Sequence, residues 1–164
     1  MTDVASGTAS LLKVMSESPL VAGATLPSLE DPITPTESFF IRNHFSVPQI
    51  DAKTWGLAIS GEVDNPVTLS YDDILSMPSL DIVNLMECAG NSRSTMQPVA
   101  EGVQWDHGAV STASWRGVPV SVVLDRVSGR KTAKDVLFDG ADHGEENHGP
   151  NELNYAMSIP MEKA

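Results

Sequence analysis

The sequence almost lacks cysteine: Cys88 is the single one among 164 residues. An intrachain disulfide is therefore excluded. Cysteine-rich zinc sites, cysteine-ligated iron–sulfur clusters and the C-x-x-C-H haem attachment are excluded too, because each needs more thiols. Aromatic residues are also few, at 5% of the chain. Apolar residues make up 41%, which is enough to build the core of one soluble domain.

Basic residues are scarce as well. Lys and Arg number 10 against 22 Asp and Glu, which gives a formal net charge of -12. A field of this sign repels both the phosphate backbone and anionic lipid, so we predict neither nucleic acid nor a membrane as partner. A small anionic substrate stays compatible with this charge, because a few local arginines can bind it.

Long apolar runs are absent too. No stretch approaches the roughly 20 apolar residues that a membrane-spanning helix needs. The first twenty residues contain neither a basic segment nor a long apolar segment, so they do not resemble a signal peptide. We expect the chain as it stands to be cytoplasmic, or periplasmic if a leader has been removed.

The chain divides by composition into two parts. Residues 1–37 are rich in Ser, Thr, Ala, Gly and Pro and are predicted to form an extended arm, with a short helical turn at residues 11–15. Residues 38–164 mix short strands with short helices, which is typical of an α+β domain with mixed sheets. The elements expected there are a hairpin over 55–70, a helix over 71–77 capped by Ser70, a buried strand over 80–88, a helix over 120–127 stopped by Gly129, and strands starting near 135 and 155.

Cys88 stands in the stretch ECAGNSRS, directly after the expected buried strand. The small residues Ala89, Gly90 and Asn91 predict a tight turn whose amides can point toward one anion. Arg93 stands close enough along the chain to favour a thiolate. The stretch therefore has features that an inert buried cysteine does not need.

Three roles for Cys88 remain open on the residues alone. A free cysteine is most often a buried, unreactive apolar residue. A nucleophile would need a base, which His44, His107, His143 or His148 would have to supply, yet no hydrolase motif surrounds the thiol. A single thiolate can also give one bond to a metal whose other ligands come from a cofactor. This last role fits the pattern best.

Several motifs together resemble the sulfite oxidase family, which comprises molybdenum enzymes that bind molybdopterin. They are FFIRNHFSVP (39–48), ECAGNSRS (87–94), WRGVPV (115–120), FDGAD (138–142) and YAMSIP (155–160), in this order. The resemblance covers nearly all of residues 31–164. It implies an α+β fold of the sulfite oxidase molybdopterin-binding type, of which this chain is the N-terminal, truncated portion.

The resemblance also implies roles for individual residues. Cys88 corresponds to the thiolate ligand of molybdenum, and Arg42 to a catalytic arginine that faces the bound oxyanion. The aspartate that ends FDGAD, Asp142, corresponds to a pterin contact. The residues expected to bind the cofactor are Phe40, Ile41, Arg42, Asn43, His44 and Asp142.

The implied function is oxidation of sulfite or a related sulfur compound by oxygen transfer at molybdenum, with electrons passed to an acceptor such as a cytochrome. Family members carry a further half of the domain, so a missing C-terminal half or a homodimer partner is expected. Where animal and plant members tend to have CAGNRR, this chain has Ser92 and Arg93, which looks closer to bacterial members of the family, including sulfane dehydrogenase-type proteins. The alternatives are a non-catalytic remnant or assembly subunit of such an enzyme, and a metal-free cysteine-dependent enzyme.

Three further features have ordinary explanations. The stretch DHGEENHG (142–149) carries metal-ligand residue types, but acidic loops are usually only solvated. His107 either approaches the entrance of the site or belongs to a turn. Trp55, Trp105 and Trp115 are expected to be packing anchors.

Overall fold

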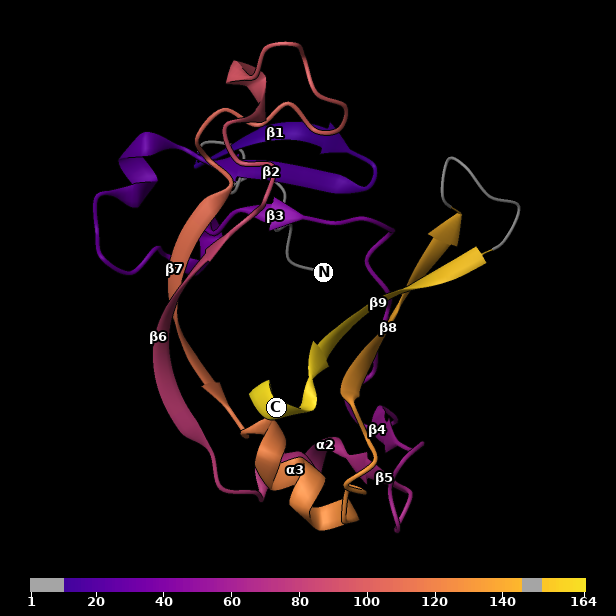
Figure 1. Cartoon of the computed structure of the whole chain (residues 1–164). Helices are drawn as coiled ribbons and strands as arrows, with labels where there is room; N and C mark the ends of the chain where they lie inside the picture. Colours follow the sequence, from indigo (N-terminus) through magenta and orange to yellow (C-terminus); the bar gives the residue numbers. More distant parts are fainter. Residues whose placement is uncertain (1–10, 146–151) are drawn as a thin grey trace. The chain divides into compact units, whose positions relative to one another are not determined.

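The computed structural model describes residues 11–145 and 152–164, which form two compact units. The first unit contains the described residues up to Val47 together with Ile82–Trp115, and the second contains Pro48–Asp81 together with the described residues from Arg116 on. Small sheets and short helices alternate, which confirms the α+β class (Figure 1). None of the helices within the described ranges is long and apolar enough to cross a bilayer.

A three-stranded antiparallel sheet organises the first unit. Strands β1 (Leu12–Glu17) and β2 (Leu20–Ala24) form a hairpin, and the short β3 (Ile41–Arg42) pairs with the other edge of β2 (Figure 1). Two short 3₁₀ helices, η1 (Leu26–Leu29) and η2 (Thr36–Ser38), lie between β2 and β3. Most of β2 is buried, because its small apolar residues fit beneath neighbouring chain segments.

The expected helical turn at residues 11–15 is wrong, because these residues lie in or beside β1. Pairing with β2 satisfies the backbone groups of β1, and this tertiary pairing outweighs a weak local helical preference. The segment predicted as an extended arm thus contributes a hairpin to the first unit. The boundary at residue 37 stays a prediction.

The core of the first unit gathers around an indole. Val21, Phe40, Trp105 and Ala109 form one buried cluster, and Trp105 is only 1% exposed. The rings of Phe40 and Trp105 meet edge to face, with centroids 6.4 Å apart. Phe39 stacks on Phe40 at 5.5 Å. The expectation that Trp105 is a packing anchor is confirmed.

The predicted strand over 80–88 is present as β6 (Leu80–Glu87), paired with β7 (Val110–Gly117). Its predicted burial is wrong, because every residue of β6 is exposed, including Val83 at 66% and Leu85 at 55%. Among the described residues β6 pairs with β7 alone, and a two-stranded ribbon leaves both faces open. A further 3₁₀ helix, η3 (Arg93–Thr95), follows β6.

The predicted hairpin over 55–70 is confirmed in the second unit. Strands β4 (Gly56–Ile59) and β5 (Val67–Ser70) pair antiparallel, with Gly56 opposite Ser70. The helix α2 (Tyr71–Leu75) follows at once. The predicted cap is also present, because Ser70 Oγ accepts the backbone N–H of Asp73 at 3.1 Å and the Asp73 carboxylate accepts the Ser70 N–H at 2.9 Å.

The second helix, α3 (Val120–Val127), has the predicted bounds. Its stop differs from the prediction, because the residue in the left-handed region is Ser128, with φ of 54°, and not Gly129. The last residue of the helix, Val127, is fully buried. Gly129 instead forms an isolated antiparallel bridge with Val63.

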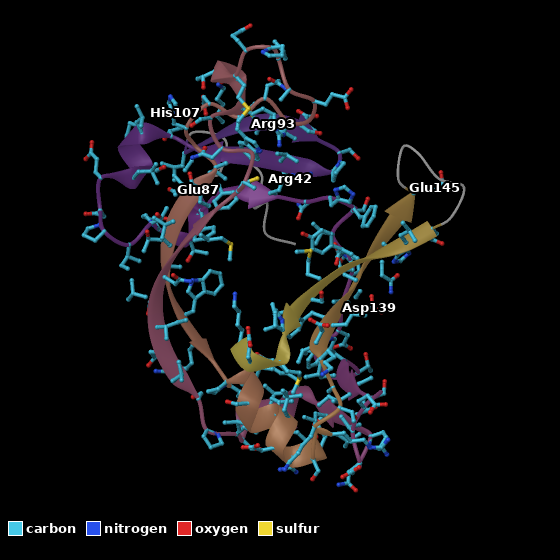
Figure 2. All side chains as sticks on the ribbon, in the orientation of Figure 1. Arg42, Glu87, Arg93, His107, Asp139 and Glu145 are labelled. Atoms are coloured by element: carbon cyan, nitrogen blue, oxygen red, sulfur yellow. The ribbon has the colours of Figure 1, made fainter. Side chains whose placement is uncertain are left out.

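The last two strands form a hairpin that is longer than predicted. They are β8 (Asp135–Glu145) and β9 (Glu152–Pro160), followed by the 3₁₀ helix η4 (Met161–Lys163). Their register shifts between Asp139 and His143, so that residues 140–142 form a bulge opposite Tyr155. The FDGAD motif therefore ends inside this bulge, which begins directly after Asp139, labelled in Figure 2.

Candidate functional site

The thiol of Cys88 lies at the rim of the buried cluster of the first unit. The residue directly follows β6, is half-buried, and packs against the cluster that contains Phe40 and Trp105. Its backbone N–H donates to the Ala109 carbonyl at 2.9 Å. The Gly90 N–H lies 3.5 Å from Cys88 Sγ and donates to it. The sulfur is thus held by backbone contacts and faces one amide donor.

The turn after Cys88 is as tight as the small residues predict, and Asn91 fixes it from both sides. The Asn91 N–H donates to the Cys88 carbonyl at 2.9 Å. Its side-chain oxygen accepts the N–H of Ala109 at 3.1 Å, and its side-chain amide donates to Glu87 at 2.8 Å. Asn91 therefore ties the start of β7 to the end of β6, on either side of the thiol.

Further bonds join the segment after Cys88 to the segment before β7. The Ser94 N–H donates to the Trp105 carbonyl at 2.9 Å. Ser92 Oγ and His107 Nδ1 lie 2.9 Å apart, within hydrogen-bond distance. Ser92 has a left-handed backbone, with φ of 64°, which directs the chain back toward this second segment. The contact with Ser92 places His107 beside the turn of Cys88. Its position in the sequence alone left this open.

Arg93 makes the third cross-connection, and its side chain lies flat between two glycines. Its Nη1 donates to the Val103 carbonyl at 3.1 Å. A Cβ atom placed on Gly90 would lie 2.7 Å from Nη2, and one placed on Gly102 would lie still closer to Nη1. Figure 2 labels Arg93 with His107 and Glu87 in this part of the first unit. A cationic group is therefore held against the turn that carries Cys88.

The R-N-H residues lie at and after the end of β3. Arg42 pairs with Val21 across the sheet, and its exposed guanidinium donates to the Asn43 carbonyl. Arg42 Nη2 also lies 3.5 Å from His44 Nδ1. The Asn43 side chain donates to the Leu20 carbonyl at 2.9 Å. These contacts hold Arg42 and His44 as a solvent-accessible pair.

The two apolar members of this motif are more enclosed. Phe40 belongs to the same cluster as Cys88, and its N–H donates to the buried Ser111 hydroxyl at 3.1 Å. Ile41 is half-buried and pairs with Ala22 on β2. Phe40 and Cys88 thus pack in one cluster. Arg42, two residues after Phe40, is exposed at the surface.

Asp142 belongs to the second unit, where the β8 bulge carries it. The residue is half-buried. Its carboxylate bends back over Gly140, because a Cβ on that glycine would lie 2.5 Å from Asp142 Oδ1 and 3.0 Å from the Tyr155 carbonyl. A side chain at position 140 would therefore displace the Asp142 carboxylate and press on the Tyr155 carbonyl.

The acidic stretch after Asp142 forms no metal site in the part of the chain that the structure describes. His143 Nε2 lies 3.2 Å from Glu152, and His143 Nδ1 lies 3.1 Å from the Ala141 carbonyl. Within the described ranges no group of three or more metal-ligand side chains comes together. Glu146 and His148, which the sequence also suggested, lie outside the described residues.

A pocket of about 370 Å³ borders the site segment in the first unit. Two of its lining residues interact, because Lys13 donates a hydrogen bond of 2.8 Å to Asp106. This bond lowers the pKa of the Asp106 carboxyl below its usual value. His107 lines this pocket and also contacts Ser92. The lining residues are Lys13, Ala24, Thr25, Leu26, Pro27, Asp106, His107 and Gly108.

Trp105 shows that the cluster offers a donor as well as apolar surface. Its indole Nε1 is buried and has no hydrogen-bond partner among the described residues. An unpaired buried N–H costs free energy, so it is typical of a place where another group binds. Together with the Cys88 sulfur and its Gly90 amide, this donor set fits an anionic, thiolate-bound metal cofactor. The sequence prediction gave Trp105 a packing role only.

Comparison with known proteins assigns the class. The family model for the oxidoreductase molybdopterin-binding domain matches residues 44–164. This match covers well over half of the chain, so the chain belongs to that family, whose cofactor is Mo-molybdopterin. The match includes Cys88 and Asp142.

Two kinds of enzyme are among the relatives. The chain is 38% identical over 93% of its length to the mitochondrial sulfite oxidase of Macaca fascicularis, and 34% identical over 94% to a nitrate reductase [NADH] of Arabidopsis thaliana. It spans 28% and 17% of those proteins. The sulfane dehydrogenase SoxCD of Paracoccus pantotrophus has a similar structure, with a TM-score of 0.71, 26% identity and coverage of 90% of this chain and 36% of that one.

Proposed function

We propose that this chain is the cysteine-bearing portion of an enzyme that oxidises sulfite or a related sulfur compound at molybdenum. Sulfite oxidases stand beside nitrate reductases among its relatives, and a solved structure that it resembles is a sulfane dehydrogenase. Two of these three kinds of protein have names that refer to sulfur compounds. The chemical class is oxygen transfer coupled to electron transfer.

The observation that carries the proposal is the surroundings of the Cys88 sulfur. It lies at the rim of a cluster that also contains a buried indole N–H, for which no described residue is a hydrogen-bond partner. A backbone amide donates to the sulfur, and the Arg93 guanidinium lies over the same turn. One amide donor to the sulfur, a cation against the same turn and a further donor in the adjoining cluster suit a metal thiolate that faces an oxyanion.

The chain's residues divide the work of binding. Cys88 is the proposed ligand of the metal. The pterin contacts are proposed from the segment with Phe40, Ile41, Arg42, Asn43 and His44, and from Asp142. Asn91 holds the turn of Cys88 in place, so that the sulfur keeps its direction when the metal binds.

When bound, the molybdenum cofactor supplies the oxygen-transfer chemistry. Overall, sulfite and water become sulfate, two protons and two electrons, and the electrons leave to an acceptor such as a cytochrome. The chain's part is electrostatic, because sulfite carries charge on oxygens that guanidinium groups bind as a fork. Arg42 is the proposed side chain for this binding, and the Trp105 N–H adds a neutral donor to the same region of the first unit.

The substrate is tested by two assays on the molybdenum-loaded protein, together with any partner chain it needs. One measures sulfite-dependent reduction of cytochrome c, and the other measures nitrate reduction with reduced viologen. We expect the first to be active and the second to be negligible. In Arg42→Gln, the sulfite KM should rise about tenfold, as expected when a charge-assisted hydrogen bond is lost. Nitrate reduction without sulfite oxidation would contradict the proposal.

A second candidate is a non-catalytic portion that serves in assembly. The exposed apolar residues of β6 favour it, because such surfaces normally pack against other polypeptide. This candidate predicts that the chain associates with another polypeptide yet retains no molybdenum. Metal content therefore separates it from the catalytic proposal.

A further inference from the structure

The Arg93 guanidinium occupies a slot whose walls are two residues without side chains. Gly90 forms one wall, where an added Cβ would approach Nη2 to 2.7 Å. Gly102 forms the other, where an added Cβ would approach Nη1 even more closely. Beside the slot, the Val103 carbonyl accepts a hydrogen bond from Nη1 at 3.1 Å. The side chain is thus fixed by steric walls and by one directional bond.

Gly102 has a second constraint that can be separated from the first. Its φ is +104°, a conformation that disfavours any side chain. Gly61 has a similar φ of +94°, but an added Cβ there would meet nothing within 4 Å. Gly61 and Gly102 therefore share the backbone constraint, but of these two only Gly102 lies against Arg93.

We propose that Gly102 is a positioning residue for Arg93: its missing side chain lets the guanidinium lie flat against the Cys88 turn. Any Cβ at position 102 pushes Nη1 away from the Val103 carbonyl. Gly102 follows the CAGN motif by more than ten residues and lies outside the sequence motifs that resemble the sulfite oxidase family. Its role acts through Arg93 and does not require contact with substrate or cofactor.

The consequence for activity rests on the proposed function. A cation that faces an oxyanion must be placed accurately, and a misplacement of about 1 Å can lower activity by about 100-fold. Gly102 therefore sets how well the cationic part of the site is aligned. The placement itself is a property of the chain and can be measured without the cofactor.

The first test measures the exposure of Arg93 in the chain without cofactor. Phenylglyoxal modifies arginine side chains, and mass spectrometry gives the modification rate of each one. We expect Gly102→Ala to raise the rate at Arg93 about fivefold, as the loss of one hydrogen bond predicts. Gly61→Ala should leave that rate unchanged, and Arg116 serves as the internal reference. Equal Arg93 rates in the two variants would overturn the proposal.

The second test guards against a variant that fails to fold. In the double variant Gly102→Ala with Arg93→Ala, the side chain that the new Cβ would clash with is gone. The free energy of unfolding lost in the double variant should therefore be smaller than the sum of the losses in the two single variants. Gly61→Ala should show no such coupling to Arg93→Ala. Absence of coupling at Gly102 would contradict the positioning role.

The third test uses the molybdenum-loaded protein and separates the two proposals. Gly102→Ala should raise the sulfite KM more than it lowers kcat, whereas Gly61→Ala should change neither. If the parent oxidises no sulfite, the proposed function fails, and the modification rates still decide the role of Gly102. If the parent is active and Gly102→Ala has the parent KM, the positioning role fails alone.

Discussion

Asn91 accepts the Ala109 N–H at 3.1 Å and thereby ties the turn of Cys88 to the residue before β7. The same side chain donates to Glu87 at 2.8 Å. One amide group thus connects both sides of the candidate ligand. A loop that carries a metal ligand needs such support, because ligand direction limits both affinity and reactivity.

Replacing Asn91 with Ala should destabilise the chain by about 1–3 kcal/mol, since the buried Ala109 N–H loses its acceptor. Glu87→Ala removes only the exposed end of the same network and should cost less than about 1 kcal/mol. Urea unfolding of both variants measures the difference. Equal costs would show that the bond to Ala109 carries no special weight.

Replacing Trp105 with Phe keeps most of the ring and removes the indole N–H. Because Trp105 is only 1% exposed, the smaller ring leaves a cavity, which should lower the free energy of unfolding of the cofactor-free chain by about 1–3 kcal/mol. In the loaded protein the sulfite KM should rise about fivefold, the effect of one lost hydrogen bond. A large loss of stability with an unchanged KM would assign Trp105 to packing alone.

The ion pair of Lys13 and Asp106 gives a pH-dependent contribution to stability. The hydrogen bond from Lys13 lowers the pKa of Asp106 in the folded chain below its value in the unfolded chain. Such a group stabilises the fold above its unfolded pKa of about 4 and loses this effect as pH falls further. Both side chains are about half exposed, so the effect at pH 7 should stay below about 1 kcal/mol.

Lys13→Met tests this contribution. The difference in unfolding free energy between parent and variant should be present at pH 7 and should shrink as the pH falls through 4 toward 3. Urea midpoints at these pH values give the comparison. A difference that grows on acidification would show that the Asp106 pKa is not lowered.

Local signals predicted much of the fold. The Ser70 cap, the bounds of α3 and the hairpin of β4 and β5 follow from capping residues and from alternation, which act over a few residues. The hairpin of β1 and β2 did not follow, because its strands are held by pairing that composition does not reveal. The exposure of β6 was missed for a similar reason, since an apolar strand sequence does not tell how many neighbours the strand has.

The candidate site divides in the same way. The motif around Cys88 predicted a tight turn of small residues, and the structure shows it. Contacts between distant segments could not be predicted, among them Ser92 with His107 and Arg93 with Gly102. The indole N–H of Trp105 illustrates the limit: a sequence identifies a packing residue, but only the structure shows that its polar atom has no partner in the part of the chain described.

The central claim, that Cys88 binds the metal, is tested most directly by molybdenum content per chain. The parent and Cys88→Ser would be expressed in a host that makes the cofactor, purified with any partner chain, and measured by elemental analysis. We predict close to one molybdenum per parent chain and background levels in Cys88→Ser. Equal molybdenum in the two proteins, or none in the parent, would contradict the account.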